Sequence, residues 1–124
     1  MTCQHILVID DEPDIRDTLK DVLEFFGFKA AVAANGLEGL HQLEELGRPC
    51  LIFLDIMMPI MNGWEFLDTL KKSREYTDAG IPIVIVSAAP DVDRIERQGY
   101  RYLKKPANID QLAAFAHEYC TKRH

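Results

Sequence analysis

The chain has 124 residues, of which 48% are hydrophobic and 27% charged, and its formal net charge is −6 at pH 7. This length and composition predict one globular domain over residues 1–124 that buries its core without disulfide bonds or a structural metal. The negative charge argues against nucleic acid or an anionic membrane surface as the main partner. Carboxylates appear by residue 10, which excludes a signal peptide, and no apolar run could span a bilayer. We therefore expect a soluble, cytoplasmic protein.

The cysteines and histidines show no spacing typical of a metal site. The three cysteines are Cys3, Cys50 and Cys120, and the four histidines are His5, His41, His117 and His124. No pair of cysteines has the C-x-x-C spacing of a zinc or redox motif. The odd number of cysteines predicts free thiols in a reducing compartment. We expect the histidines to lie at the surface or on helix faces.

Five short apolar runs are predicted to form strands. They lie at residues 6–9, 30–33, 51–54, 83–86 and, less strongly, 100–104. The first four are apolar at every position instead of alternating. This pattern is typical of strands that are covered on both faces, as in a parallel sheet.

Helical spacing of apolar residues follows each run. The first helix begins near Pro13, which a first turn tolerates, the second follows the Asn35-Gly36 turn, and the last follows Asn108, a predicted N-cap. The third and fourth cover about 62–72 and 91–98. The predicted apolar positions of the first, second and last helices are Ile15, Leu19, Val22, Leu23 and Phe26, then Leu37, Leu40, Leu43 and Leu46, then Ile109, Leu112, Phe115, Ala116 and Tyr119. Five strand–helix units in alternation predict an α/β three-layer sandwich.

Charged and polar residues follow the predicted strands at the edge where such sheets bind ligands. They are Asp10, Asp11 and Glu12 after the first strand, Asp55 after the third, Ser87 at the end of the fourth, and Lys104 and Lys105 after the fifth. Neighbouring carboxylates a few Å apart repel by about 4 kcal/mol at an effective dielectric of about 20. A hard divalent cation such as Mg²⁺ offsets this repulsion.

The same set of residues fits phosphoryl transfer, which needs positioning and charge neutralisation more than covalent help. Asp55 is the predicted nucleophile, since carboxylates can form acyl phosphates, and Ser87 and Lys105 are predicted to bind the other oxygens of the transferred group. Each residue alone has an ordinary explanation as a cap, a turn residue or a surface lysine. Their coincidence at the correct strand ends favours a site.

Four motifs together carry a resemblance to a known family. They are VIDDEPD at the first strand, LDIMMPIMNG at the third, VIVSAA at the fourth and YLKKP at the fifth. In this combination, over essentially its whole length, the chain resembles the receiver domain of bacterial two-component response regulators. The resemblance implies a doubly wound, flavodoxin-like five-stranded parallel sheet in the order 2-1-3-4-5. It also implies a phospho-acceptor signalling switch rather than an enzyme with turnover.

The resemblance assigns roles to individual residues. Asp55 would be phosphorylated from a histidine of a sensor kinase or a histidine phosphotransfer protein. Asp11 and Asp55 would bind Mg²⁺ together with the backbone carbonyl of Met57, while Asp10 would act through a bound water. Ser87 would bind the phosphoryl group and Lys105 would pair with it, because the lysine of the family directly precedes the proline. Lys104 would then be a solvated neighbour, and the Lys105-Pro106 bond would be cis.

The resemblance also implies a switch and exposes a departure from the family pattern. Tyr102 occupies the position of the strand-five aromatic that follows the movement of Ser87 after phosphorylation. The segment between Ser87 and Gly99 supports only about two turns of helix, roughly one turn fewer than the family pattern. That region is the usual output and dimerisation face, so we expect a monomer or a weak phosphorylation-dependent dimer. Our hypothesis is that output uses the first helix near Ile15 and the loop near Ala107.

Two other residues bear on the lifetime of the phosphoryl group. Neither Met57, two residues after the acceptor, nor Ala89, two residues after the hydroxyl, can act as a general base. We therefore predict slow to intermediate autodephosphorylation.

Two other classes of function remain open on the sequence alone. A small Mg²⁺-dependent phosphatase with an Asp nucleophile would carry that residue on strand one, where this chain has Asp10-Asp11-Glu12. A flavin or nucleotide binder would need a loop rich in Gly, Ser or Thr after strand one, and this chain places anions there. A receiver without an effector domain would signal by protein contact or by onward phosphotransfer.

Overall fold

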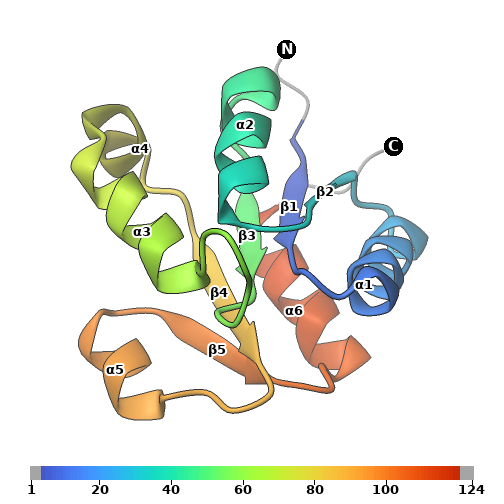
Figure 1. The fold of residues 1–124 in the computed structure, drawn as a ribbon. Helices are drawn as coiled ribbons and strands as arrows, with labels where there is room; N and C mark the ends of the chain where they lie inside the picture. Colours follow the sequence, from blue (N-terminus) through green and yellow to red (C-terminus); the bar gives the residue numbers. More distant parts are fainter. Residues whose placement is uncertain (1–3, 121–124) are drawn as a thin grey trace.

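The computed structural model describes residues 4–120, and Figure 1 shows the course of the chain. Strands and helices alternate along the sequence except for one additional helix, α4. The elements are β1 (Ile6–Ile9), α1 (Pro13–Phe25), β2 (Ala30–Ala33), α2 (Gly36–Leu46), β3 (Leu51–Leu54), α3 (Gly63–Lys72), α4 (Arg74–Ala79), β4 (Ile83–Ser87), α5 (Val92–Arg97), β5 (Arg101–Lys104) and α6 (Ile109–Tyr119).

The five strands form one parallel sheet in the order β2-β1-β3-β4-β5. This confirms the predicted doubly wound α/β sandwich. The central strands β1 and β3 are buried at every position, as their continuous apolar sequences predicted. The carboxyl ends of the strands lie at one edge of the sheet, so the residues that follow β1, β3, β4 and β5 come together there.

Helices cover both faces of the sheet. On one face, Leu23 of α1 and Leu112 of α6 pack against Ile6, Val8 and Phe53. The other face is covered by α2, α3 and α5, which contribute Leu43, Phe66, Leu67 and Ile95 to a second apolar cluster. The alternation of strand side chains between the two clusters follows from the two-residue repeat of a β-strand.

The predicted helix boundaries agree closely with the structure, with differences at particular residues. The side chain of Asn35 accepts a hydrogen bond from the Glu38 N–H, and that of Asn108 accepts one from the Gln111 N–H, so both are N-caps. The short helix before β5 is confirmed, since α5 has six residues. Leu37, Leu46 and Ile109, placed on apolar helix faces by the sequence, are 44%, 49% and 53% exposed.

The additional helix α4 lies between α3 and β4 and was not predicted. None of its six residues is buried. A helix without a buried face has no apolar periodicity, so the sequence pattern carries no signal for it.

The prediction of free thiols is wrong for two of the three cysteines. Cys50, directly before β3, and Cys120, directly after α6, form a disulfide with their Cα atoms 5.5 Å apart. The two cysteines are 70 residues apart in the sequence, so no local pattern indicates that they are in contact in the folded chain. The cysteines therefore give no support for a reducing compartment. Cys3 lies outside the described residues.

The prediction for the histidines is wrong for His5, which is buried directly before β1, where its carbonyl accepts a hydrogen bond from the Cys50 N–H at 2.9 Å. The burial follows from its place at the start of the central strand. His41 and His117 are exposed on α2 and α6 as predicted, and His124 lies outside the described residues.

Candidate phosphoryl-acceptor site

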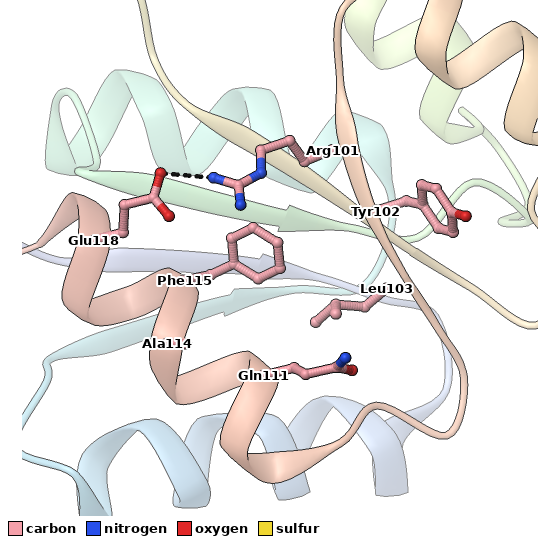
Figure 2. Close-up of a pocket in the computed structure, with 7 residues that line it drawn as sticks. All are labelled: Arg101, Tyr102, Leu103, Gln111, Ala114, Phe115 and Glu118. Carbon is pink, nitrogen blue, oxygen red and sulfur yellow. Dashed lines mark hydrogen bonds and ion pairs between the residues drawn. The ribbon is translucent and has the colours of Figure 1, made fainter.

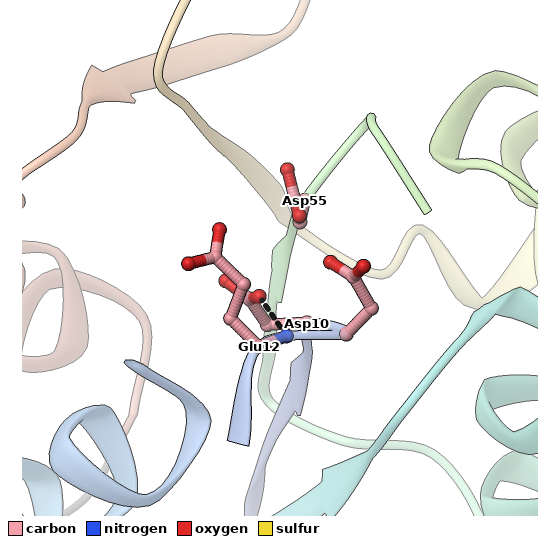
Figure 3. Close-up of side chains that lie close together, drawn as sticks. Asp10, Glu12 and Asp55 are labelled. Carbon is pink, nitrogen blue, oxygen red and sulfur yellow. Dashed lines mark hydrogen bonds between the residues drawn. The ribbon is translucent and has the colours of Figure 1, made fainter. Parts of the chain in front are cut away.

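Four carboxylates meet at the carboxyl edge of the sheet. Asp10, Asp11 and Glu12 follow β1 and Asp55 follows β3, and one oxygen from each lies within 4.8 Å of the others. Figure 3 shows the side chains of Asp10, Glu12 and Asp55 close together at the ends of these two adjacent strands. Asp10 and Asp55 are 1% and 4% exposed, whereas Glu12 is exposed.

The backbone holds the two buried carboxylates in place. The N–H of Asp55 donates to the carbonyl of Ile9 at 2.9 Å, which continues the pairing of β3 with β1 beyond the last strand residue. The N–H of Met57 donates to Asp55 Oδ1 at 3.3 Å, and the N–H of Glu12 donates to Asp10 Oδ1 at 2.9 Å. Both side chains therefore accept a bond from a residue two positions later, which orients the remaining oxygen of each into the cluster.

Lys105 brings the positive charge to this cluster. Its Nζ lies 2.9 Å from Asp10 Oδ2, 3.4 Å from Asp55 Oδ2 and 3.4 Å from Glu12 Oε1. The N–H of Lys105 donates to the carbonyl of Ser87 at 2.9 Å, and the Lys105-Pro106 peptide is cis. Lys104 is exposed, as expected for a solvated neighbour of Lys105. Of the two lysines, the structure places only Lys105 among the carboxylates.

The charges and the burial of the site change the pKa values of two groups. Burial raises the pKa of Asp55 from 3.8 to about 6, with a further contribution from the Asp10 charge, against the lowering effects of Lys105 and the Met57 N–H. Burial disfavours the ammonium of Lys105, but the carboxylates of Asp10, Asp55 and Glu12 together raise the pKa of this lysine above its ordinary value. Lys105 therefore stays protonated at neutral pH.

The donor set fits a hard divalent cation. Carboxylates and a backbone carbonyl are the oxygen ligands that Mg²⁺ prefers. Although Lys105 Nζ is 2.9 Å away, Asp10 Oδ2 accepts no hydrogen bond of good geometry from the described residues. Four carboxylates converge here against the single positive charge of Lys105, so a further cation would offset their repulsion. The cluster can therefore hold a metal ion.

The remaining predicted residues lie around this cluster. Ser87, at the end of β4, is 3% exposed, and its Oγ accepts a hydrogen bond from the Ala89 N–H at 3.3 Å. Tyr102 is half-buried on β5 and packs against the apolar cluster beneath α2, α3 and α5. The side chain of Met57 is 76% exposed, and Ala89 is also exposed. Neither side chain offers a base.

A close backbone approach shapes the loop that carries Asp55 into α3. A Cβ on Gly63 would lie 2.6 Å from the carbonyl oxygen of Asp55 and 2.8 Å from the Cα of Ile56. The N–H of Gly63 donates to the carbonyl of Ile56 at 2.9 Å. Only glycine fits this position without a shift of the backbone. The Pro and Gly in the loop sequence are typical of a tightly shaped loop of this kind.

Two features near the site escaped the sequence prediction. The guanidinium of Arg94 on α5 lies 4.0 Å from the ring of Trp64 on α3, a contact between two helices that are 30 residues apart. Ile60 has a φ of 69°. A signal for Ile60 was present, because an isoleucine stands in a tight Pro-x-Met-Asn-Gly loop where a turn residue is typical.

The comparison with protein families decides the assignment. The family model described as "Response regulator receiver domain" matches residues 6–117. The chain belongs to this family. Its membership confirms the predicted class, a phosphoryl-accepting signalling switch, and gives no support to the phosphatase alternative. A receiver domain implies a partner that carries a phosphohistidine.

Known proteins similar to this receiver domain agree with the assignment. It is 37% identical over 115 residues to the "DNA-binding response regulator MtrA" of Mycolicibacterium smegmatis, covering 90% of this chain and 48% of the relative. Two solved structures, each 30% identical with a TM-score of 0.79, are the Francisella response regulator 1452 receiver domain and a CheY-like receiver domain protein from Methanospirillum hungatei. They cover 94% and 93% of this chain, and 95% and 91% of their own chains.

This receiver domain spans about half the length of the curated relatives that it matches. The activity and partners of a whole regulator are therefore matters for proposal. Within residues 4–120, no helix has both the length and the apolar character that crossing a membrane requires.

Proposed function

We propose that this receiver domain accepts a phosphoryl group on Asp55 from the phosphohistidine of a sensor histidine kinase or a histidine phosphotransfer protein. The position of Asp55 carries the proposal: it is a buried carboxylate at the end of β3, with Lys105 Nζ 3.4 Å from its Oδ2. A pKa of about 6 leaves this group mostly ionised at neutral pH. It is therefore available as a nucleophile.

In the transfer step, an oxygen of ionised Asp55 attacks the phosphorus and an O–P bond forms. The P–N bond of the donor histidine breaks, and its electron pair stays on the imidazole nitrogen, which then takes up a proton. Lys105 and Ser87 bind oxygens of the transferred group. Lys105 already lies against Asp55 and Asp10, so it needs little movement to do so.

Mg²⁺ is the proposed cofactor. Asp11, Asp55 and the backbone carbonyl of Met57 would hold it, and Asp10 would act through a bound water. When bound, the ion supplies the positive charge that lets an anionic phosphoryl group approach a group of carboxylates. The observation in favour of this assignment is the excess of negative charge, because four carboxylates converge within 4.8 Å and Lys105 supplies one positive charge against them.

The proposed readout begins at Ser87 and Tyr102. Phosphorylation draws the hydroxyl of Ser87 toward the phosphoryl group, and Tyr102 on the adjacent strand β5 follows. The signal then passes by protein contact or by onward phosphotransfer. The relative in Mycolicibacterium smegmatis is named a DNA-binding regulator, and we assign no DNA binding to residues 1–124. We propose a cytoplasmic protein that is a monomer or a weak phosphorylation-dependent dimer, without a membrane partner.

We propose that the output surface lies at α1 and the loop after β5. A cavity of about 230 Å³ there is lined by Ile15, Thr18, Pro106 and Ala107, next to the stem of Lys105. On the other side of α6, Figure 2 shows Arg101 between Glu118 and Phe115. Its guanidinium pairs with Glu118 at 2.6 Å and lies 4.4 Å from the Phe115 ring.

The ground for placing the output surface at α1 is the short helix α5, which has six residues and lies in the region that the family uses for dimerisation. The test is sedimentation of the phosphorylated protein. Phosphorylation-dependent dimerisation that disappears when Arg97 and Arg101 are replaced would contradict this output surface.

A chemical labelling experiment tests the phospho-acceptor proposal itself. The protein is incubated with Mg²⁺ and acetyl phosphate, and its intact mass is measured. We expect a gain of one phosphoryl group that Asp55→Asn abolishes and that Lys104→Ala retains, since Lys104 points to solvent. Labelling that survives Asp55→Asn would overturn the choice of acceptor.

A further inference from the structure

A disulfide bond joins the start of the central strand β3 to the end of α6. Its two cysteines, Cys50 and Cys120, are partly buried at the border of the apolar cluster that α1 and α6 cover. A cytoplasmic protein, as proposed above, meets thiols that reduce accessible disulfides, so a disulfide in that compartment is usually a reversible one. Exchange of the bond requires that a thiolate reaches one of its two sulfurs.

Cys50 lines a cavity of about 570 Å³ at the edge of the sheet where β1, β2 and β3 begin. His5, Lys29 and Arg48 also line this cavity, and none of the described residues around it is acidic. Cys120 is absent from the described lining, so the cavity gives access to Cys50 and not to its partner. A cavity of this size accepts a small organic ligand.

The cavity carries positive charge on an acidic protein. Arg48 is exposed there, and no carboxylate of residues 4–120 forms an ion pair with it. The formal net charge of the whole chain is −6. A small molecule that carries carboxylates is therefore repelled by most of the surface and attracted to this cavity.

We propose that the disulfide of Cys50 and Cys120 is a reversible exchange site for a small thiol that carries carboxylate groups. The thiolate of the small molecule attacks Sγ of Cys50, a new S–S bond forms, and the bond between the two cysteines breaks. The electron pair stays on Sγ of Cys120, which takes up a proton. A second small thiol then releases Cys50, so that the protein disulfide is reduced and two small thiols are oxidised to one disulfide.

Opening the bond loosens the last turn of α6. The buried side chains of this helix all precede that turn and are Leu112, Ala113 and Ala116. In the last turn, Glu118 pairs with Arg101 of β5 at 2.6 Å, and the Tyr119 hydroxyl accepts a hydrogen bond from Arg101 at 3.2 Å. An ion pair between exposed side chains contributes little to stability. The disulfide is therefore a principal restraint on this turn, and its state is passed to Arg101 on β5.

The rate of reduction by different thiols tests the site. All proteins carry Cys3→Ser, so that the thiols counted are those of Cys50 and Cys120. Bond opening is followed by intact mass after alkylation, with glutathione as the anionic probe and 2-mercaptoethanol as the neutral one. Arg48→Gln removes the positive charge from the cavity, and Arg74→Gln is the matched control because Arg74 is exposed on α4.

We expect Arg48→Gln to lower the rate constant for glutathione by about three- to tenfold at low salt, because one unit charge about 6 Å away in water changes the local concentration of an anion of charge about −1 to −2 by that factor. The rate with 2-mercaptoethanol stays within about 1.5-fold, and salt at about 0.5 M removes the difference for glutathione. Arg74→Gln matches the wild type with both thiols. Equal rates of wild type and Arg48→Gln with glutathione at low salt would overturn the site.

Two further measurements test the attacked sulfur and the switch. Oxidised glutathione should add one glutathionyl group to Cys50 in Cys120→Ser, and it should add one to Cys120 in Cys50→Ser about tenfold more slowly. Reduction of the disulfide should speed amide exchange at Glu118 and Tyr119 by about tenfold or more, with little change at Leu112.

The opposite outcomes are equally definite. A faster reaction of Cys120 than of Cys50, or unchanged exchange in the last turn of α6, would overturn the proposal. So would a bond that only a protein reductant opens, or two cysteines that stay free thiols after oxidation in air. None of these measurements depends on phosphorylation of Asp55.

Discussion

Replacing Asp55 by Asn is expected to stabilise the protein in the absence of metal. The substitution removes a buried negative charge beside Asp10 and keeps an oxygen that can accept the Met57 N–H bond. The pKa of Asp55 is raised from 3.8 to about 6 by burial and the Asp10 charge. At about 1.36 kcal/mol per pKa unit, the ionised group costs the folded state about 3 kcal/mol above pH 7.

The pH dependence of this difference has a definite sign. Between pH 3.8 and about 6 the folded protein binds the proton of Asp55 more tightly than the unfolded chain does, so the wild type loses stability as the pH rises through this window. The advantage of Asp55→Asn is therefore about 3 kcal/mol at pH 7.5, roughly half of that at pH 5 and smaller still at pH 4. It falls toward zero as the pH drops below 3.8.

Urea unfolding in EDTA measures this difference. With a slope of about 1–3 kcal/mol/M, a gain of about 3 kcal/mol moves the midpoint upward by about 1–3 M. Addition of Mg²⁺ raises the midpoint of the wild type, because binding to the folded state stabilises it, and raises that of the variant less. Asp21→Asn, an exposed carboxylate on α1, is the control and should change stability by less than about 0.5 kcal/mol. The reasoning would be refuted if Asp55→Asn were no more stable than the wild type in EDTA at pH 7.5. It would also be refuted if the difference in unfolding free energy between the two proteins did not change with pH.

Three further predictions concern the loop, the phosphoryl lifetime and the disulfide. Gly63→Ala should destabilise the fold by about 1–3 kcal/mol in urea unfolding, because its Cβ would meet the backbone of Asp55 at 2.6 Å; an unchanged midpoint would show that the loop yields freely. The acyl phosphate should persist well beyond seconds when its decay is followed by intact mass, since neither Met57 nor Ala89 supplies a base worth about 10²–10⁴-fold, and a half-life of seconds would contradict this. Cys50→Ser should lower the free energy of unfolding by about 2–5 kcal/mol relative to the oxidised wild type, because the disulfide closes a loop of 70 residues; reduction of the wild type should reproduce the loss, and equal midpoints would mean that the bond does not form in solution.

Much of the fold could be predicted because apolar strands and capped helices are local signals. The fully apolar runs at Ile6–Ile9 and Leu51–Leu54 form the two central strands, and Asn108 is the predicted N-cap of α6. The strand order came from the resemblance and not from these patterns. The helix α4 gave no signal because nothing in it is buried.

The residues of the candidate site could be predicted from the sequence, whereas the contacts elsewhere in the fold could not. Asp10, Asp55, Ser87 and Lys105 follow strands whose ends must meet in a parallel sheet, so their convergence follows from topology. The disulfide of Cys50 could not be predicted in this way, because it depends on a tertiary contact between segments that are distant in the sequence.

The conformation of Ile60 also depends on context, since an isoleucine by itself disfavours positive φ. Its neighbours Gly36 and Gly63 enforce the turn through contacts that no local pattern contains.

The disulfide has a chemical consequence that concerns the opposite end of the sheet. An acyl phosphate is an activated acyl group, and a nearby thiolate would attack its carbonyl carbon and destroy the signal as a thioester. Cys50 precedes β3 and Asp55 follows it, so roughly 16 Å of extended strand separates the two. Cys120 is held at the Cys50 end by the same bond. Among residues 4–120 both cysteine sulfurs are therefore bonded to each other and lie at the end of β3 away from the proposed acyl phosphate, so no cysteine thiolate stands beside it.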